Sequence, residues 1–124
     1  MLLKEHLNKK LLLVDDEVII LMTLCRDLEL AGYDVTSATN GEEALIKLRK
    51  DRFDVVITDL VMEEIDGIQV LNEAKRIDPQ TPVLILTGYS NTVLAQEAFS
   101  KADGFLLKPC DIDDILSQIS QCLK

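Results

Sequence analysis

The stretch FDVVITDLVM, residues 53–62, decides the fold. Its apolar core, VVI, is short and continuous, which is typical of a strand buried on both faces of a parallel sheet. The run closes on Thr58 and Asp59, so polar side chains stand where the strand ends. The stretch PVLILT, residues 82–87, has the same form. Two runs of this kind predict central strands whose carboxyl ends carry polar groups.

Short apolar runs alternate with amphipathic stretches along the chain. The apolar runs predict strands at residues 10–14, 34–38, 53–58, 82–87 and 105–107. The amphipathic stretches predict helices at residues 18–31, 41–51, 67–77, 91–101 and 112–123. Five β-α units in this order favour an α/β fold in which helices cover both faces of a parallel sheet. The second run, DVTSA, is the least apolar and is expected at an edge of the sheet.

Length and composition restrict the class of protein. The chain has 124 residues, of which 48% are hydrophobic and 28% charged, as is typical of one globular domain. We expect a single domain over residues 1–124, with residues 1–9 as a short N-terminal extension. Thirteen basic and 22 acidic residues give a net charge of -9. This charge has the wrong sign for direct binding to nucleic acid.

Compartment signals in the sequence are few. No apolar run is long enough to cross a membrane, and the opening MLLKEHLNKK lacks the apolar segment of a signal peptide. Cys25, Cys110 and Cys122 show no CxxC spacing, so neither zinc nor a disulfide framework is favoured. His6, in the extension, is expected to face solvent. We therefore expect a cytoplasmic protein in a reducing compartment.

Polar residues close four of the five apolar runs. In an open parallel α/β sheet, ligands bind at the carboxyl ends of the strands. These ends hold Asp15, Asp16, Asp59, Thr87 and Lys108. Three clustered carboxylates repel one another, which favours either a raised pKa or a bound hard cation such as Mg2+. A cation and a lysine beside a carboxylate suit phosphoryl transfer, with Asp59 as the nucleophile.

Motifs in the same order and spacing identify a family that this sequence resembles. They are VDDE at residues 14–17, DVVITDLVM at 54–62, DG at 66–67, LTG at 86–88 and FLLKP at 105–109. Together they resemble the receiver domain of two-component response regulators, over residues 10–123. The resemblance implies a flavodoxin-like, doubly wound (βα)5 fold with five parallel strands in the order 2-1-3-4-5.

The resemblance also implies roles for the acidic residues. Asp59 corresponds to the phosphoacceptor of the family. Asp16 corresponds to a direct Mg2+ ligand, and Asp15 to a residue that acts on the metal mainly through water. The main-chain carbonyl of Val61 corresponds to the remaining protein ligand.

Four further positions match functional positions of the family. Thr87 resembles the switch hydroxyl that hydrogen-bonds a phosphoryl oxygen, and Lys108 resembles the lysine that pairs with the phosphate. Phe105 resembles the aromatic residue whose rotamer follows the state of Thr87. Gly88 stands where the family has a small residue. The bond between Lys108 and Pro109 is expected to be cis, as the resemblance implies.

The sequence departs from the family pattern after the phosphoacceptor. Residues 62–67 read MEEIDG, so Glu63 and Glu64 replace a proline and a glycine that are common in the family. The geometry of this loop is therefore an open question at the level of sequence. Val61 and Tyr89, which border the path of the attacking water in the family, offer no acid or carboxamide. We therefore expect slow hydrolysis of an aspartyl phosphate.

The leading interpretation is a signalling module rather than an enzyme that turns over an external substrate. It would take a phosphoryl group from a histidine kinase or a histidine phosphotransfer domain onto Asp59, and would catalyse only its own phosphorylation and dephosphorylation. A hydrolase with an aspartyl-phosphate intermediate needs an acid two residues after the nucleophile, where this chain has Val61. A receiver-like protein that is never phosphorylated usually lacks an acid or the lysine, and neither is missing here.

The sequence of the fifth predicted helix bears on how the domain binds its partners. In regulators that form a charged symmetric dimer, the fifth helix carries arginines, whereas residues 111–124 contain none. We therefore expect a monomer or weak dimer that binds an unknown downstream protein. Whether the chain is a stand-alone protein or part of a larger regulator or hybrid kinase is left open.

Overall fold

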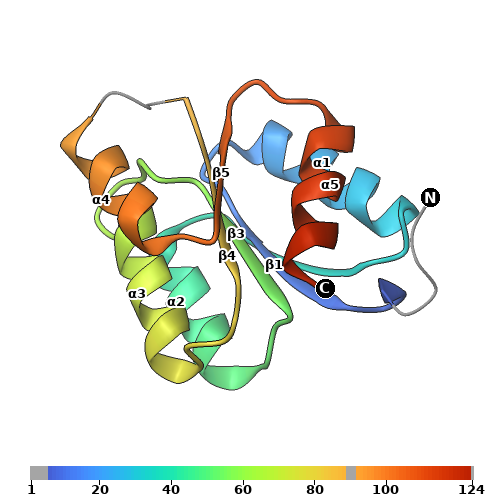
Figure 1. Cartoon of the computed structure of the whole chain (residues 1–124), viewed down its shortest axis with the longest axis horizontal. Coiled ribbons are helices and arrows are strands. Elements are labelled where there is room, and N and C mark those ends of the chain that lie inside the picture. The colour runs from blue at the N-terminus through green and yellow to red at the C-terminus, as the bar shows by residue number, and fades with distance from the viewer. Residues whose placement is uncertain (1–5, 89–91, 124) are drawn as a thin grey trace.

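The computed structural model of the chain describes residues 6–88 and 92–123. Its sheet consists of β1 (Lys10–Val14), β2 (Asp34–Ala38), β3 (Val55–Thr58), β4 (Val83–Thr87) and β5 (Gly104–Leu107). All pairings are parallel, and the strand order is β2-β1-β3-β4-β5. The expected doubly wound, flavodoxin-like sheet is confirmed (Figure 1).

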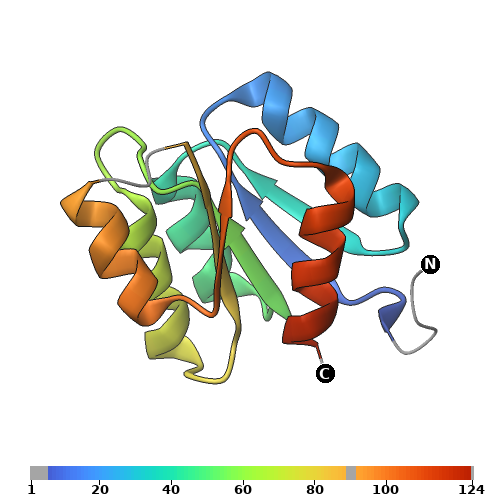
Figure 2. The same cartoon turned by 45° about the horizontal axis from the view of Figure 1, so that its top comes forward.

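Helices cover both faces of this sheet, as expected. They are α1 (Val18–Leu30), α2 (Gly41–Lys50), α3 (Gly67–Ile77), α4 (Val93–Lys101) and α5 (Ile112–Cys122). The helices α2, α3 and α4 pack on one face, whereas α1 and α5 pack on the other (Figures 1 and 2). Element ends either agree with the sequence-based expectation or differ from it by at most two residues, within the usual uncertainty of ends. The expected start of the fourth helix, Asn91, lies outside the described residues.

Side chains of the central strands alternate between the two helical layers. On β1, Leu11 and Leu13 pack in the cluster formed with α1 and α5, whereas Leu12 and Val14 pack in the cluster formed with α2, α3 and α4. Every residue of β3 and β4 is buried. The strand β2 is mostly half-buried and lies at an edge, which confirms the expectation for DVTSA. The strand ends are therefore held rigidly by two separate apolar layers.

Local signals explain where two helices begin and end. At the end of α1, Gly32 has φ of 107° and its N–H donates to the Glu29 carbonyl, while the Tyr33 N–H donates to the Leu28 carbonyl. This is a glycine-terminated helix end, because a left-handed φ carries no Cβ penalty at glycine. At the start of α2, the Asn40 side chain accepts a hydrogen bond from the Glu43 N–H at 2.7 Å.

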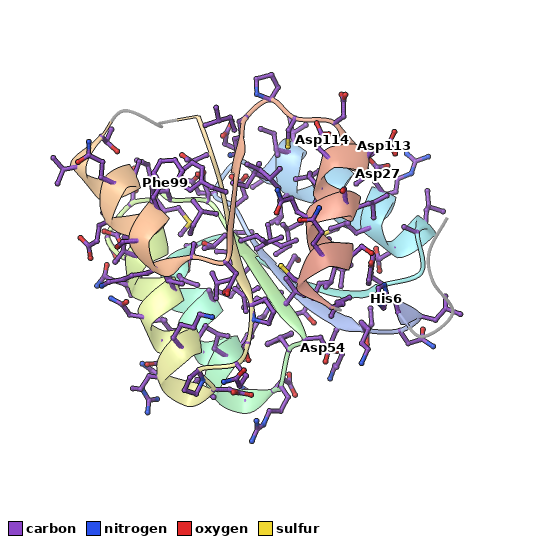
Figure 3. The ribbon with its side chains drawn as sticks, in the orientation of Figure 1. His6, Asp27, Asp54, Phe99, Asp113 and Asp114 are labelled. Carbon is purple, nitrogen blue, oxygen red and sulfur yellow. The ribbon has the colours of Figure 1, made fainter. Side chains whose placement is uncertain are left out.

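The N-terminal extension differs from the expectation. His6 is only 3% exposed and does not face solvent (Figure 3). The Asn8 N–H donates to the Gly32 carbonyl at 2.9 Å, which is a tertiary contact, and the Lys9 N–H donates to the His6 carbonyl at 3.2 Å, which forms a local turn. These bonds turn the extension toward the end of α1. None of the helices in the described part of the chain is long and apolar enough to cross a membrane.

Candidate functional site

Backbone hydrogen bonds at the carboxyl ends of the strands place the principal polar side chains. Asp15 directly follows β1, and Asp59 directly follows β3. The Asp59 N–H donates to the Val14 carbonyl at 2.8 Å, and the Lys108 N–H donates to the Thr87 carbonyl at 2.9 Å. Each residue is thus tied to the end of the neighbouring strand. The sheet itself brings two acids and a lysine together at its carboxyl end.

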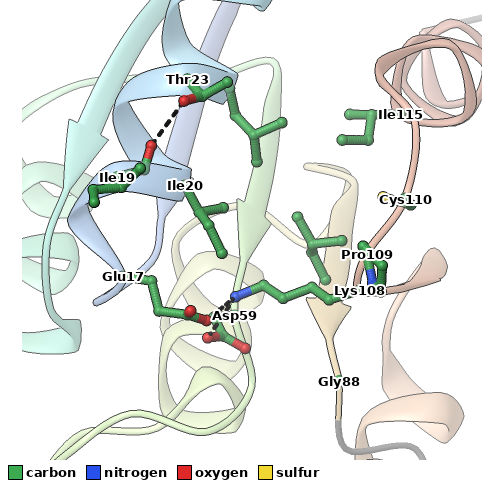
Figure 4. A pocket seen from close by; sticks show the side chains of 12 residues that line it. Glu17, Ile19, Ile20, Thr23, Asp59, Gly88, Lys108, Pro109, Cys110 and Ile115 are labelled. Atoms are coloured by element: carbon green, nitrogen blue, oxygen red, sulfur yellow. Dashed lines mark hydrogen bonds and ion pairs between the residues drawn. The ribbon is translucent and has the colours of Figure 1, made fainter.

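The ammonium of Lys108 lies among three carboxylates, of which Figure 4 shows those of Glu17 and Asp59. Its Nζ is 2.7 Å from Asp15 Oδ2, 2.9 Å from Glu17 Oε1 and 3.1 Å from Asp59 Oδ2. Asp15 is 1% exposed and Asp59 is 5% exposed. Carboxylate oxygens of the same three acids lie within 4.8 Å of one another, a spacing that can hold a metal ion. The site therefore concentrates negative charge around the Lys108 ammonium at the carboxyl end of the sheet.

The balance of burial and neighbouring charges raises the pKa values of both Asp59 and Lys108. Burial raises the pKa of Asp59; the Lys108 ammonium opposes this shift, and the charge of Asp15 adds to it. Burial alone would lower the pKa of Lys108, but the close carboxylates of Asp15 and Glu17 and the charge of Asp59 outweigh this effect and raise that pKa. Lys108 is therefore held as an ammonium, while Asp59 is a weaker acid than an exposed aspartate.

The structure does not bring all of the expected acids together. Asp16 is exposed and does not belong to the group of three carboxylates, whereas Glu17 does. Direct contact of Asp16 with a metal remains a prediction, as does that of the Val61 carbonyl. The residue Val61 is 41% exposed. Sequence reasoning identified Glu17 only as the last letter of VDDE. Its place directly after an acidic pair, at the start of a helix, was the available signal.

The expected switch residues lie on the neighbouring strands. Thr87 is fully buried at the end of β4. Phe105, on β5, is half-buried, and its ring stacks on that of Phe99 from α4 with centroids 3.9 Å apart. The bond between Lys108 and Pro109 is cis, as expected. Tyr89 lies outside the described residues.

The loop after Asp59 is held close to the start of α3. The Gly67 N–H donates to the Leu60 carbonyl at 2.8 Å, and a Cβ at Gly67 would lie 2.3 Å from the Asp59 carbonyl oxygen. Asp66 caps α3 through a capping box with Gln69. Glu64 adopts φ of 62°. Residue 64 therefore has a left-handed backbone conformation, even though glutamate stands there in place of the family's glycine.

A cavity of about 670 Å³ opens beside the carboxylates, between α1 and the segment that leads into α5 (Figure 4). Glu17, Asp59 and Lys108 form its polar side. The remaining lining is mainly apolar and includes Ile20 and Ile115. Gly88, at the position where the family has a small residue, also lines the cavity. The acidic site is thus reached from a mainly apolar opening.

A doubly wound parallel sheet with clustered carboxylates and one lysine at its carboxyl edge defines a class of α/β domain suited to cation and phosphoryl binding. The family model described as "Response regulator receiver domain" matches residues 11–120. This chain therefore belongs to the receiver domains of two-component response regulators.

Known proteins support the same assignment. The transcriptional regulatory protein ZraR of Escherichia coli (strain K12) is 39% identical over 122 residues, which cover 95% of this chain and 27% of ZraR. The receiver protein CpdR of Brucella abortus is 34% identical, over 93% of this chain and 97% of CpdR. The crystal structure of TrrA from Thermotoga maritima, in complex with Mg2+ and BeF, superposes with a TM-score of 0.84 at 32% identity and covers 93% of this chain and 99% of that one. The chain thus spans about a quarter of the length of ZraR but nearly all of CpdR.

Proposed function

We propose that this receiver domain accepts a phosphoryl group on Asp59 from a histidine kinase or a histidine phosphotransfer domain. One Asp59 carboxylate oxygen forms the new O–P bond while the P–N bond of the phosphohistidine breaks, and the released imidazole nitrogen takes up a proton. The observation that carries this proposal is the buried Asp59 carboxylate, paired with Lys108 at 3.1 Å. The domain catalyses only its own phosphorylation and dephosphorylation.

We further propose that Mg2+ is the cofactor of this step. The residues present fit the ion, because hard cations prefer oxygen ligands and carboxylate oxygens of Asp15, Glu17 and Asp59 already lie within 4.8 Å of one another. Asp16 directly follows Asp15 in the chain. Asp16 and Asp59 are the proposed direct ligands, together with the Val61 carbonyl, and Asp15 acts through water. Mg2+ bound there would neutralise negative charge on the transferring phosphoryl group. Titration with Mg2+ should give a much weaker response in Asp16→Ala than in the unaltered domain.

In the proposed cycle, the neighbouring side chains detect the phosphoryl group. Lys108 pairs with one phosphoryl oxygen, and the Thr87 hydroxyl donates a hydrogen bond to another. Movement of Thr87 makes room for Phe105 to turn inward, which changes the surface formed by α4, β5 and α5. The Val61 side chain is neither an acid nor a carboxamide, so it does not orient the attacking water, and the phosphoryl group is long-lived.

The proposed output is binding to another protein in the cytoplasm, with no direct contact to nucleic acid or membrane. The α4 and β5 surface exposes Val93, Phe99 and Leu107. The first turn of α5 carries Asp113 and Asp114, and its last turn carries no basic residue. This composition favours a monomer or weak dimer over a charged symmetric dimer. Sedimentation before and after treatment with beryllium fluoride distinguishes the two.

Intact mass spectrometry tests the phosphorylation directly. The domain is incubated with a small phosphodonor, with Mg2+ or with EDTA, beside the Asp59→Asn variant. We expect the mass of one phosphoryl group in the unaltered domain with Mg2+ only. An equal gain in the asparagine variant, or no gain in the unaltered domain, overturns the proposal.

A further inference from the structure

Glu17 occupies the N-cap position of α1, but its side chain does not cap the helix. Serine, threonine, aspartate and asparagine are the residues that usually cap helices from this position. The Glu17 N–H donates to Asp15 Oδ1 at 2.9 Å, so only the backbone of Glu17 takes part in local structure. Its carboxylate instead accepts a hydrogen bond from Lys108, 91 residues away in the chain. The helix start therefore lacks a side-chain cap, and the freed carboxylate points into the site.

Glu17 approaches the ammonium from the solvent side. Its side chain is 57% exposed, whereas those of Asp15 and Asp59 are 2% and 7% exposed. In Figure 4 the Glu17 carboxylate and Asp59 lie on the same side of the Lys108 ammonium, at the end of its extended side chain. An ion pair this exposed contributes little to folding, because water screens it. Its effect is therefore expected on the geometry of Lys108 and not on stability.

We infer that Glu17 is a positioning residue for Lys108, which holds one N–H of the ammonium so that another is directed at Asp59. The inference rests on the proposed phosphoryl transfer to Asp59. Lysine is a point charge on a flexible four-carbon stem. The nearest carboxylate, Asp15 at 2.7 Å, makes an ion pair with it but no hydrogen bond, so this contact does not fix the direction of the N–H groups. Hydrogen bonds to Glu17 and Asp59, at 2.9 and 3.1 Å, together define that direction.

This arrangement leaves Glu17 in place while Asp59 reacts. When a phosphoryl group is added to Asp59, the N–H that pointed at Asp59 Oδ2 turns to a phosphoryl oxygen. The N–H bound to Glu17 keeps its partner, and Asp15 remains beside the ammonium. The Lys108 ammonium thus needs only a small displacement, which lowers the cost of orienting it during phosphoryl transfer.

Two substitutions separate positioning from charge. Glu17→Gln removes the charge but keeps an oxygen that accepts a hydrogen bond, whereas Glu17→Ala removes both. Rates of phosphorylation by a small phosphodonor are measured by intact mass, at a Mg2+ concentration shown by titration to saturate each variant. We expect Glu17→Ala to be about two- to fivefold slower, as loss of an exposed charged hydrogen bond predicts, and Glu17→Gln to be within about twofold. Glu29→Ala, on the exposed side of the same helix, is the control and should not change the rate.

An effect of charge alone gives a different result. Both variants lose the same negative charge near an anionic phosphodonor. If only charge mattered, the two variants would react at the same rate as each other, and neither would be slower than the unaltered domain. That result overturns the inference, as does an unchanged rate in Glu17→Ala. A second readout is the 15N signal of the Lys108 ammonium, whose slow hydrogen exchange should be lost in Glu17→Ala and kept in Glu17→Gln. If the unaltered domain is not phosphorylated at all, the proposed function fails, and the 15N signal alone tests the position of Lys108.

Discussion

Carboxylates lie at both ends of the sheet, but they are used differently. At the amino end, Asp54 accepts a hydrogen bond from the Lys10 N–H at 2.7 Å (Figure 3). There, too, Asp103 accepts one from the Val83 N–H at 2.8 Å and pairs with Lys75 at 2.7 Å. Each of these acids has partners of its own and holds the start of a strand. At the carboxyl end, three carboxylates instead share a single ammonium.

This difference separates acids that stabilise the fold from acids that are retained for chemistry. Where a carboxylate has partners of its own, it satisfies a backbone N–H, and in Asp103 an ion pair also neutralises its charge. Where several crowd together, burial and mutual repulsion make the charged form of at least one unfavourable, as the raised pKa of Asp59 indicates. A fold under selection for stability alone would not keep the second arrangement.

The largest expected effect comes from the glycine beside Asp59. Gly67→Ala would place a Cβ 2.3 Å from the Asp59 carbonyl oxygen, which is backbone and cannot move aside cheaply. We expect a loss of about 2–3 kcal/mol in the free energy of unfolding, measured with urea, and a large loss of phosphorylation.

The matched control lies at the other end of the sheet. A Cβ at Gly104 would meet the ends of the Leu84 and Gln118 side chains, which can move. Gly104→Ala should therefore cost less than about 1 kcal/mol and leave phosphorylation intact. Equal losses in the two variants would show that the carboxyl end is no more constrained than the amino end.

The same chemical change should have opposite effects on stability at the two ends. Asp59→Asn removes a crowded, buried charge and should raise the free energy of unfolding by about 1 kcal/mol at pH 7 in EDTA. Asp103→Asn removes the ion pair with Lys75 and should lower it by about 1 kcal/mol. Urea titrations of both variants measure the two changes. A loss of stability in Asp59→Asn would contradict the division drawn between the ends.

The stabilising effect of Asp59→Asn should depend on pH. The folded pKa of Asp59 lies above its ordinary value of 3.8, so the folded state prefers the neutral carboxyl. In the unaltered domain this group therefore destabilises the fold increasingly as the pH rises from 3.8 through the folded pKa. The advantage of Asp59→Asn should be complete above the folded pKa and absent below 3.8. Urea titrations between pH 3 and pH 8 check this, and an advantage that persists at pH 3 would assign it to another cause.

The smallest expected effect concerns the loop after Asp59. Glu64 has φ of 62°, a conformation that costs a residue with a Cβ more than it costs glycine. Glu64→Gly should therefore stabilise the domain by about 0.5–1 kcal/mol, despite the greater freedom of glycine in the unfolded chain. Glu64→Ala, which keeps the Cβ, should not, and equal gains in both variants would assign the effect to the lost charge.

Much of this architecture could be predicted because apolar period and strand-end polarity are local properties. The run VVIT is bounded by Asp54 and Asp59, and the run VLILT by Pro82 and Gly88, so the burial and the ends of both could be located before any contact was known. Asp59 and Lys108 follow from the same argument, because the ends of parallel strands meet at one edge.

Other features depend on contacts between distant segments. His6 is buried because the extension binds the Gly32 carbonyl through Asn8, which no local pattern encodes. The role of Glu17 depends on the direction of a side chain relative to Lys108, 91 residues later. Spacing placed Asp16 beside the other acids, but in the structure it is exposed and Glu17 joins the cluster.

The position of the phosphoryl group tests the central claim most directly. The domain is phosphorylated with a small phosphodonor and Mg2+, then reduced with borohydride, which converts an aspartyl phosphate to homoserine. Peptide mass spectrometry then locates the modified residue. We predict homoserine at position 59 and unmodified aspartate at positions 15, 16, 54 and 103. Homoserine at any of these other positions, with Asp59 unchanged, would contradict the account.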